Sequence, residues 1–462
     1  MRTDLDAIVI GSGQAGPFLA SRLTAAGRRV ALVERAQLGG TCVNHGCMPT
    51  KTLVASARAA HIARRAADYG VRIGGPVQID MPAVKARMDR VVQQSVGNLT
   101  RWLEGMPNLS LLRGHARFAG PHEIEVNGRR LQAPQVFVNV GCRAVLPDWP
   151  GIDSTPVLDN VGLLALDAVP EHLIVIGGSY IGLEFAQIHR RFGARVTVLE
   201  AADRIVARED EQVSRELAAI LGGEGIELIT GVGAARVERT ADGQVRVSLQ
   251  SRGVAHEIVG SHLLSAIGRR PNTDDLGLAA AGIRTDARGF ITVDDQLRTN
   301  VPGIWALGDV NGRGAFTHTA YHDHQIVAAN LLDGEQRSVR ERIPAYALFT
   351  DPPLARIGMD EAQVRASGRR ALVGTLPMTR VGRARERGET QGYMKVWVDA
   401  RTQRILGATL LCIDADEIVH SLLDVMAADA PYTVVQRCVH IHPTVSELIP
   451  TLLGSLTELT PD

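Results

Sequence analysis

A pattern of apolar strand, glycine-rich turn, helix-like stretch and second apolar strand occurs twice in this chain, and each copy ends in a glutamate. The first copy reads AIVIGSGQAGPFLASRLTAAGRRVALVE, and the second reads LIVIGGSYIGLEFAQIHRRFGARVTVLE. Gly11 and Glu34 are separated by the same number of residues as Gly177 and Glu200. Two βαβ units in one register predict an α/β fold with two domains built on parallel sheets.

The glycine turns indicate what these units bind. Glycine lets the backbone approach a pyrophosphate whose charge is stabilised by the N-terminus of the following helix. The glutamate at the end of the second strand can accept hydrogen bonds from a ribose diol. We therefore expect two Rossmann-like dinucleotide-binding domains. The candidate contact residues are Gly11, Gly13, Gly16 and Glu34 in the first unit, and Gly177, Gly182 and Glu200 in the second, where Ser179 replaces the middle glycine.

Length and charge narrow the class of protein. A chain of 462 residues is expected to form several domains. Its 50 basic side chains balance 50 acidic ones, so no net charge favours nucleic acid or an anionic membrane. No stretch offers about 20 consecutive apolar residues, and the opening MRTDLDAIVIGSG leaves no room for a secretory signal. We expect a cytoplasmic protein whose partners are small molecules or metal ions.

Two of the five cysteines lie close together in the sequence, just before a predicted helix. Cys42 and Cys47 lie in GGTCVNHGCMPTK, ahead of an Ala-rich helical run. A helix N-terminus stabilises a thiolate, and Lys51 would share the helical face of Cys47. A metal site would need further ligands nearby, so we interpret the two as a redox pair rather than as metal ligands or unrelated cysteines. The remaining cysteines are expected to be buried small side chains: Cys142, Cys412 and Cys438.

A set of motifs occurs in the order found in one enzyme family: GSGQAG, GGTCVNHGCMPTK, GGSYIGLEFA, AIGRRPN, ALGDV and HPTVSE. The chain resembles the class I pyridine-nucleotide–disulfide oxidoreductases, the family of glutathione reductase, dihydrolipoyl dehydrogenase and mercuric reductase, over essentially its whole length. The resemblance implies FAD, NADH or NADPH, and a homodimer. It implies a discontinuous FAD-binding domain at residues 1–150 and 271–340, an NAD(P)-binding domain at 151–270, and an α+β dimerisation domain at 341–462.

The resemblance also assigns roles at the redox centre. Cys42 matches the thiol that exchanges with substrate, and Cys47 matches the thiol that contacts the flavin. Lys51 matches the lysine near flavin N5, and Glu184 matches the glutamate that pairs with it. These residues are therefore the candidate catalytic groups in the first half of the chain.

Further roles follow from the later motifs. Tyr180 matches the aromatic gate over the nicotinamide pocket, Asp309 matches a carboxylate that binds FAD, and Gly268 in AIGRRPN is a further nucleotide contact. His442 and Glu447 match an acid–base dyad that the partner subunit supplies. An imidazole held by a carboxylate is suited to giving a proton to a departing thiolate near neutral pH.

The identity of the nicotinamide depends on the second glutamate. Glu200 would repel the 2′-phosphate of NADPH, so NADH is preferred. Arg204 and Arg208 follow closely and could reach a phosphate, or they could simply lie on a solvated face.

The electron acceptor is left open by the sequence. Dihydrolipoyl dehydrogenases usually have an AHKAxxEG-like helix where this chain has THTAYHDHQ, and mercuric reductases usually end in paired cysteines where it ends TELTPD. VFVNVGCRAVLP and MTRVGRARERGET resemble a mercuric-reductase-like branch that includes reductases linked to reactive-chlorine and metal stress. The expected acceptor is a disulfide, a metal ion or an oxidant. The alternatives are a dihydrolipoyl dehydrogenase, a mercuric or Cu(II) reductase, an NAD(P)H oxidase or diaphorase, and a non-catalytic flavin redox sensor.

Two histidine groups could suggest a metal site. His318 and His322 would share a helical face with His324 close by, and His440 and His442 would share a strand face. Because the chain's 14 histidines are spread along it, we assign no resident metal to either group.

Overall fold

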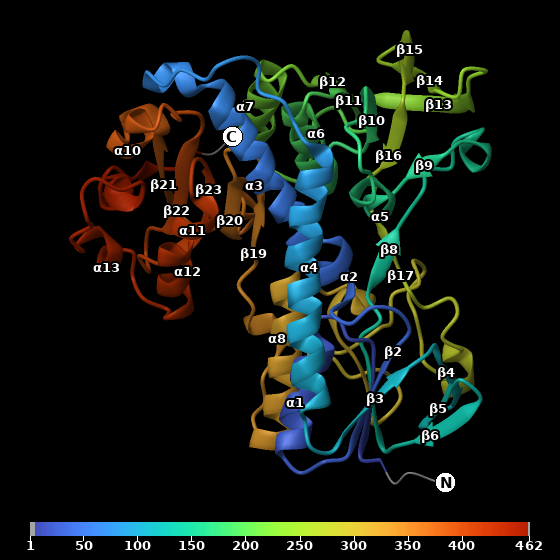
Figure 1. The fold of residues 1–462 in the computed structure, drawn as a ribbon. Coiled ribbons are helices and arrows are strands. Elements are labelled where there is room, and N and C mark those ends of the chain that lie inside the picture. The colour runs from blue at the N-terminus through green and yellow to red at the C-terminus, as the bar shows by residue number, and fades with distance from the viewer. Residues whose placement is uncertain (1–4, 461–462) are drawn as a thin grey trace.

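The computed structural model describes residues 5–460. Residues 1–4, on which part of the signal-peptide argument rests, and residues 461–462, at the end of TELTPD, lie outside the described residues. The molecule contains two parallel-sheet domains and a C-terminal α+β domain that packs beside them (Figure 1). The predicted fold class is confirmed.

The first domain is built on a five-stranded parallel sheet in the order β18–β7–β1–β2–β3. Its strands are β1 (Ala7–Ile10), β2 (Val30–Glu34), β3 (Leu109–Arg113), β7 (Gln135–Val138) and β18 (Ile304–Ala306). Strands β1 and β2 are buried on both faces, as expected for apolar strands in a parallel sheet covered by helices. Helices α1 (Ala15–Ala25) and α8 (Thr317–Ala328) pack against each other on this sheet.

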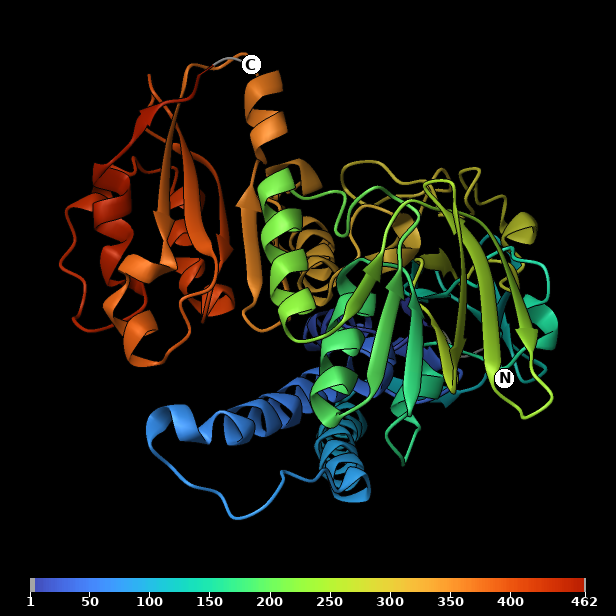
Figure 2. The same ribbon diagram turned by 90° about the horizontal axis from the view of Figure 1, so that it is seen from above.

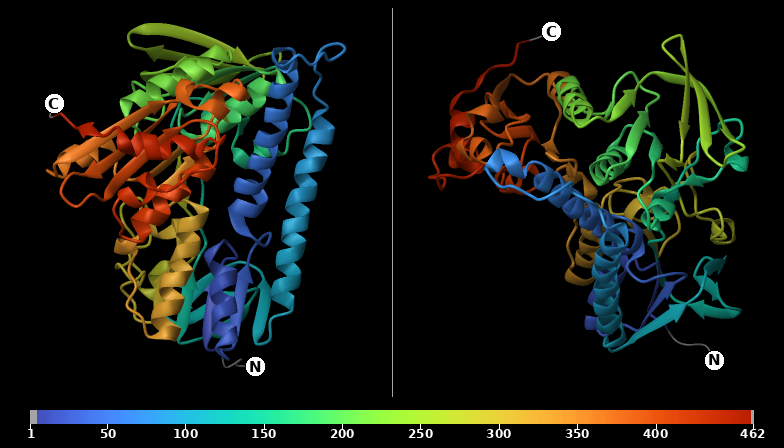
Figure 3. Two further views of the ribbon diagram at one scale, coloured as in Figure 1. Left: turned by 90° about the vertical axis from the view of Figure 1, so that its left-hand side faces the viewer. Right: turned by 45° about the horizontal axis from the view of Figure 1, so that its top comes forward.

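Two long helices follow the cysteine region in the sequence. Helix α2 (Gly40–His45) leads directly into α3 (Cys47–Arg64), and α4 (Met81–Glu104) returns beside α3. The two long helices lie side by side in the left view of Figure 3, and Figure 2 shows the loop that joins them. A three-stranded antiparallel sheet follows, formed by β4 (Ala116–Gly120), β5 (Glu123–Val126) and β6 (Arg129–Gln132).

The second domain repeats the parallel plan in the order β12–β11–β10–β16–β9. Its strands are β9 (Val157–Leu158), β10 (His172–Ile176), β11 (Arg195–Leu199), β12 (Glu227–Ile229) and β16 (His262–Ser265). Its helices are α5 (Asn160–Leu164), α6 (Tyr180–Phe192) and α7 (Glu211–Gly223). An antiparallel sheet of β13 (Val232–Arg239), β14 (Val245–Ser251) and β15 (Val254–Gly260) precedes β16.

The chain crosses between the two domains through a short antiparallel ladder. Strand β8 (Cys142–Ala144) leaves the first domain, and β17 (Arg269–Pro271) pairs with it on the way back. Strand β18 then joins the first sheet beside β7, although it follows the whole second domain in sequence. The five-stranded sheet is therefore built from two segments of the chain that the second domain separates.

The C-terminal domain contains a six-stranded antiparallel sheet in the order β19–β20–β23–β22–β21–β24. These strands are β19 (Ala345–Leu348), β20 (Leu354–Gly358), β21 (Ala371–Pro377), β22 (Tyr393–Asp399), β23 (Ile405–Leu411) and β24 (Thr457–Glu458). The helices of this domain are α9 (Glu361–Ala366), α10 (Gly382–Glu386), α11 (Ala415–Ile418), α12 (His420–Ala427), α13 (Thr433–Gln436) and α14 (Ile449–Gly454). Across residues 5–460, no helix is both long and apolar enough to cross a lipid bilayer.

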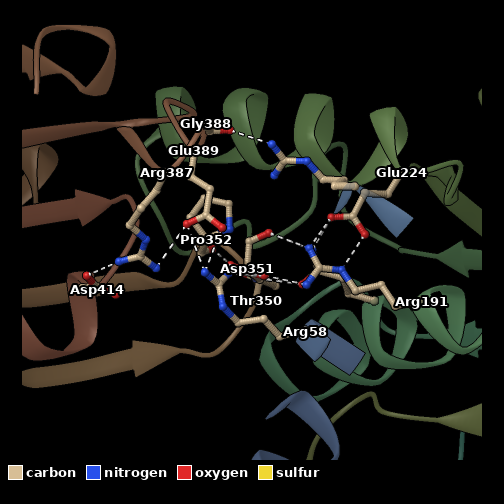
Figure 4. A network of polar contacts seen from close by, with 12 residues as sticks. Arg58, Arg191, Glu224, Thr350, Asp351, Pro352, Arg387, Gly388, Glu389 and Asp414 are labelled. Carbon is tan, nitrogen blue, oxygen red and sulfur yellow. Dashed lines mark hydrogen bonds and ion pairs between the residues drawn. The ribbon is translucent and has the colours of Figure 1, made fainter. Parts of the chain in front are cut away.

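An ion-pair network joins α3, α6 and the C-terminal domain, and so connects all three parts of the molecule (Figure 4). Asp351, just before β20, accepts hydrogen bonds from Arg58 of α3 at 2.7 Å and from Arg191 of α6 at 2.6 Å. Arg191 also binds Glu224 at 2.7 Å, and Arg58 also binds Glu389 at 2.8 Å. Burial alone would raise the pKa of Asp351, but Arg191 and Arg58 hold it below its usual value.

We expect Asp351→Asn to lower the free energy of unfolding by about 3 kcal/mol, because two guanidinium groups would lose their shared counter-charge in a buried setting. The measurement is thermal unfolding of the FAD-loaded protein. Asp68→Asn is the matched control, since Asp68 pairs with Arg65 at an exposed position and such pairs contribute little. A carboxylate whose pKa is lowered in the folded state stabilises the fold at pH values above its usual pKa. The difference in stability between the unaltered protein and Asp351→Asn should therefore disappear as the pH falls through the folded-state pKa of Asp351. Equal melting of Asp351→Asn and the control near neutral pH would show that the network does not hold the domains together.

Candidate active site

One cavity of about 2140 Å³ contains most of the residues singled out from the sequence. Both glycine turns line it, and so do the cysteine pair and the first strand of the C-terminal domain. The predicted site residues on its wall are Gly11, Gly13, Glu34, Cys42, Cys47, Lys51, Gly177, Tyr180, Glu184, Glu200, Gly268 and Asp309. The fold therefore brings together segments that are far apart in the chain.

The two glycine turns have the same geometry. Gly11 has φ of 100°, and a Cβ there would lie 2.3 Å from the carbonyl oxygen of Asn139. Gly177 has φ of 110°, and a Cβ there would lie 2.5 Å from the carbonyl oxygen of Ala266. Only glycine fits a left-handed turn pressed against a neighbouring strand. Gly16 and Gly182, in the helices that follow, are buried rather than on the cavity wall.

The two glutamates also repeat their hydrogen bonds. Glu34 accepts from the backbone N–H of Ser12 at 2.9 Å and of Ala36 at 2.8 Å. Glu200 accepts from the N–H groups of Gly178 and Ala202, both at 2.7 Å. Each carboxylate is therefore fixed at the cavity wall with lone pairs left over, which is what a ribose diol needs. These turns and carboxylates fit two dinucleotides.

The cysteine pair lies where two helices meet. Cys42 lies within α2, and Cys47 is the first residue of α3, with Gly46 between the helices. Both are free thiols in the structure. The Cys42 thiol donates to Cys47 and, with Thr317 and the charge of Lys51, lowers the pKa of Cys47 to about 6 against the effect of burial. The same hydrogen bond, together with burial, raises the pKa of Cys42. The pair is thus polarised into one thiolate and one thiol.

Thr317, the first residue of α8, is a functional candidate that sequence reasoning missed. Its hydroxyl Oγ1 lies 3.1 Å from Cys47 Sγ. The signal that could have found it is its place at the start of the helix that follows the ALGDV motif.

We expect Thr317→Val to raise the pKa of Cys47 by roughly one unit, because a hydrogen bond to a charged group contributes about 1.5 to 3 kcal/mol and one unit corresponds to about 1.4 kcal/mol. The alkylation rate of Cys47 by iodoacetamide, mapped by mass spectrometry against pH, should therefore rise at higher pH than in the unaltered protein. Thr52→Val is the control, since the Thr52 hydroxyl bonds the Met48 carbonyl. An unmoved alkylation profile in Thr317→Val would remove Thr317 from the site.

Lys51 and Glu184 form the predicted pair. Lys51 Nζ lies 2.6 Å from Glu184 Oε2, and Glu184 Oε1 accepts the N–H of Phe349 at 2.9 Å. The ammonium also lies 4.5 Å from the centre of the Phe349 ring. Lys51 is thereby held on the cavity wall, one helical turn from Cys47.

Asp309 lies in the short 3-10 turn that follows β18 and binds Arg269 at 2.7 Å. Burial raises the pKa of Asp309, while Arg269 opposes this. Arg269 belongs to the AIGRRPN motif, so this ion pair joins the crossover to the second half of the first domain. Gly268, with φ of 137°, precedes it on the cavity wall.

Tyr180 begins α6 and lies among aromatic side chains of the cavity wall. Its ring centre is 6.3 Å from Phe316 and 5.6 Å from Tyr346. Its hydroxyl donates to the buried Glu209 at 2.6 Å.

The predicted dyad is formed, but away from this cavity. His442 Nδ1 and Glu447 Oε2 are 2.6 Å apart. The His442 side chain is 81% exposed, and the dyad is not among the residues lining the cavity of this chain. Two apolar neighbours are also exposed, Val439 at 98% and Ile441 at 78%. An exposed apolar segment that carries a hydrogen-bonded His–Glu pair is suited to contact with another subunit.

The histidine groups have other partners than a metal. His318 Nε2 lies 2.7 Å from the carbonyl of Ala345, and His322 Nδ1 accepts from Arg342 at 3.1 Å. His324 stacks on Phe18, and His440 Nδ1 lies 2.8 Å from the carbonyl of Ser446. Within residues 5–460, no cluster of three or more His, Cys, Asp or Glu side chains has metal-binding geometry.

Two details differ from or refine the sequence expectations. Cys142 and Cys412 are buried as predicted, but Cys438 is exposed, because it follows α13 in the segment that leads to the dyad. Arg204 is engaged by the carbonyls of Glu209 and Ala207, whereas Arg208 lies on the cavity wall.

Comparisons with known proteins agree with this geometry. Residues 5–323 match the family model of pyridine nucleotide-disulphide oxidoreductases, and residues 344–453 match the dimerisation domain of that family. The chain is 39% identical over 457 residues to the probable pyridine nucleotide-disulfide oxidoreductase RclA of Escherichia coli strain K12, covering 97% of this chain and 98% of that protein. It is 34% identical to a dihydrolipoyl dehydrogenase of Cupriavidus necator, with 97% of each chain covered.

A solved structure gives the same result in three dimensions. The Cu(II) complex of the HOCl-induced flavoprotein disulfide reductase RclA from Escherichia coli superposes with a TM-score of 0.89 at 37% identity, covering 98% of this chain and 99% of that one. The chain therefore belongs to the pyridine nucleotide-disulphide oxidoreductase family, whose enzymes depend on FAD and use NAD(P)H.

Proposed function

We propose that the chain is an NADH-preferring flavoprotein reductase that passes electrons through Cys42 and Cys47 to a metal ion of the Cu(II) class. The observation that carries this proposal is the pair of cysteines on the cavity wall, with Cys47 at the N-terminus of α3 and its sulfur 3.1 Å from the Thr317 hydroxyl. FAD, when bound, supplies the step between nicotinamide hydride and the cysteine disulfide. Lys51 and Glu184 would form the part of the cavity wall beside the bound FAD.

The reduced pair suits a soft acceptor. Thiolate sulfur is a ligand that copper and similar ions prefer, and two adjacent sulfurs can deliver two electrons in one-electron steps. The balanced reaction is two Cu(II) ions and one dithiol giving two Cu(I) ions, one disulfide and two protons. The likeness to a reductase solved as a Cu(II) complex supports this acceptor.

The base that removes the proton from Cys42 is expected to come from a second subunit. Since Cys42 stays protonated beside the Cys47 thiolate, it needs a base before it can act as nucleophile or ligand. The His442–Glu447 pair is formed for that task but is exposed. We therefore propose a homodimer in which the partner subunit's His442 takes the proton from Cys42.

The NADH preference rests on Glu200. Its carboxylate is fixed at the wall, and Arg204 is already occupied by backbone carbonyls, which leaves Arg208 as the cation available to a 2′-phosphate. A cytoplasmic location suits a chain that has no disulfide outside the proposed redox pair.

A dihydrolipoyl dehydrogenase is the second candidate. Glu200 and HPTVSE are shared with those enzymes, and one of them is 34% identical to this chain. The same dithiol would then run in the opposite direction and reduce NAD⁺.

The test is a steady-state comparison of NADH and NADPH with Cu(II), glutathione disulfide, lipoamide and oxygen as acceptors, under otherwise equal conditions. We expect NADH with Cu(II) to give the highest kcat/KM, with Cu(I) trapped by a chelator. Lipoamide as the best acceptor would establish the dehydrogenase instead, and oxygen as the best acceptor, with no need for the cysteines, would establish an oxidase.

A further inference from the structure

A buried carboxylate connects the two tyrosines of the cavity wall. Glu209, in the loop before α7, has a side chain that is 0% exposed. Its Oε1 accepts hydrogen bonds from Tyr180 at 2.6 Å and from Tyr346 at 2.8 Å. Its Oε2 accepts from Arg356 at 2.6 Å. Glu209 itself is not among the residues that line the cavity, so it acts on the cavity only through the tyrosines.

The tyrosines come from different domains. Tyr180 begins α6 in the second domain, and Tyr346 lies on β19 of the C-terminal domain. Phe316, ahead of α8 in the first domain, stacks on Tyr346 with ring planes 8° apart. This aromatic wall is therefore assembled where all three domains meet, and Glu209 fixes two of its members from behind.

Both hydroxyls are donors at neutral pH. Burial and the neighbouring Glu209 charge raise the pKa of Tyr180, and they raise the pKa of Tyr346 to about 12. Two hydroxyls that donate to the same oxygen compete for it, because each hydrogen bond draws on the negative charge of that oxygen and so weakens the other hydrogen bond. Displacing Tyr180 would still leave Glu209 with Arg356 and Tyr346, so the buried charge would not be left without a partner.

We propose that Glu209 is a positioning residue that holds Tyr180 across the nicotinamide side of the cavity, and that Tyr346 sets how firmly Tyr180 is held. The inference rests on the proposed function and on the resemblance that matches Tyr180 to the aromatic gate over the nicotinamide pocket, a gate that must move when the nicotinamide enters. The apparent affinity for nicotinamide is then the intrinsic affinity multiplied by the fraction of molecules in which Tyr180 is displaced, so a larger displaced fraction gives tighter binding.

The proposal predicts opposite effects from two conservative substitutions. Tyr180→Phe keeps the ring but removes its bond to Glu209, so the displaced state becomes more populated and binding tightens. Tyr346→Phe removes the hydroxyl that competes with Tyr180 for Glu209. Glu209 then has one partner fewer whenever Tyr180 moves away, so the displacement of Tyr180 becomes harder and nicotinamide binding weakens. A role limited to packing would give losses of the same sign in both variants.

The measurement is the Kd of NAD⁺ for each FAD-loaded variant by fluorescence quenching, with the KM and kcat for NADH alongside. We expect Kd and KM to fall up to about tenfold in Tyr180→Phe and to rise severalfold in Tyr346→Phe. Tyr69→Phe removes an exposed hydroxyl that donates to the Arg387 carbonyl and is expected to leave both values unchanged. FAD content and melting temperature verify that each variant is folded.

The outcomes separate this inference from the proposed function. An unchanged or raised Kd in Tyr180→Phe, in protein that is folded and FAD-loaded, overturns the role of Glu209, and so does a shift of the same sign in both variants. Should NADH fail to reduce the flavin of the unaltered enzyme, the proposed function itself is overturned.

Discussion

A Cys42→Ser variant is expected to lose acceptor reduction by a factor on the order of 10³ or more, while NADH still bleaches the flavin. The serine hydroxyl can neither form the disulfide with Cys47 nor bind a soft metal ion as a thiolate does. The split between intact flavin reduction and lost acceptor reduction places Cys42 after the flavin in the electron path.

The matched control is Cys438→Ser, because Cys438 is an exposed free thiol outside the cavity. Its acceptor reduction should stay within twofold or so of the unaltered enzyme, as for surface substitutions in general. If Cys42→Ser kept a tenth or more of the activity, electrons would be leaving the flavin without passing through the cysteine pair.

The second large effect is expected from His442→Ala, which should lower acceptor reduction by about 10² to 10⁴-fold, the range for loss of a general acid–base group. The reason is the polarised dithiol: Cys42 keeps its proton beside the Cys47 thiolate, so its activation depends on an outside base. The rate of flavin reduction by NADH should stay unchanged, because His442 is not on the cavity wall of its own chain.

Hybrid dimers identify which subunit supplies His442. A dimer made from one Cys42→Ser chain and one His442→Ala chain has one site with both defects and one site with none, if the dyad acts across the interface. Such hybrids, purified with two affinity tags, should recover about half of the activity of the unaltered dimer, since the two sites of a symmetric dimer are equivalent. Hybrids as inactive as either parent would place both residues in the same chain's site.

The repeated βαβ pattern predicted the two nucleotide-binding domains because its requirements are local. Gly11 and Gly177 are needed where a left-handed turn presses against the next strand, and Glu34 and Glu200 cap the second strands through the same backbone hydrogen bonds. The reactivity of Cys47 could also be predicted from local sequence, because Cys47 begins α3 and a helix N-terminus stabilises a thiolate.

Contacts between distant segments could not be derived in this way. Thr317 reaches Cys47 only because the chain returns to its first domain after the whole second domain, and Glu209 reaches Tyr346 only because the second domain packs against the C-terminal domain. No periodicity or spacing in the sequence specifies these distances. The exposure of Cys438 was mispredicted for a related reason: an apolar thiol in a segment that the single chain leaves uncovered looks like a core residue in the sequence.

The central claim is that the Cys42–Cys47 dithiol takes its electrons from the bound flavin. The most direct measurement is an anaerobic titration of the FAD-loaded enzyme with NADH, followed at long wavelength for the charge-transfer band of a thiolate against oxidised flavin, with Cys47→Ala in parallel. We predict a band that develops at half-reduction in the unaltered enzyme and is absent in Cys47→Ala. Direct bleaching to fully reduced flavin without such a band would contradict the account.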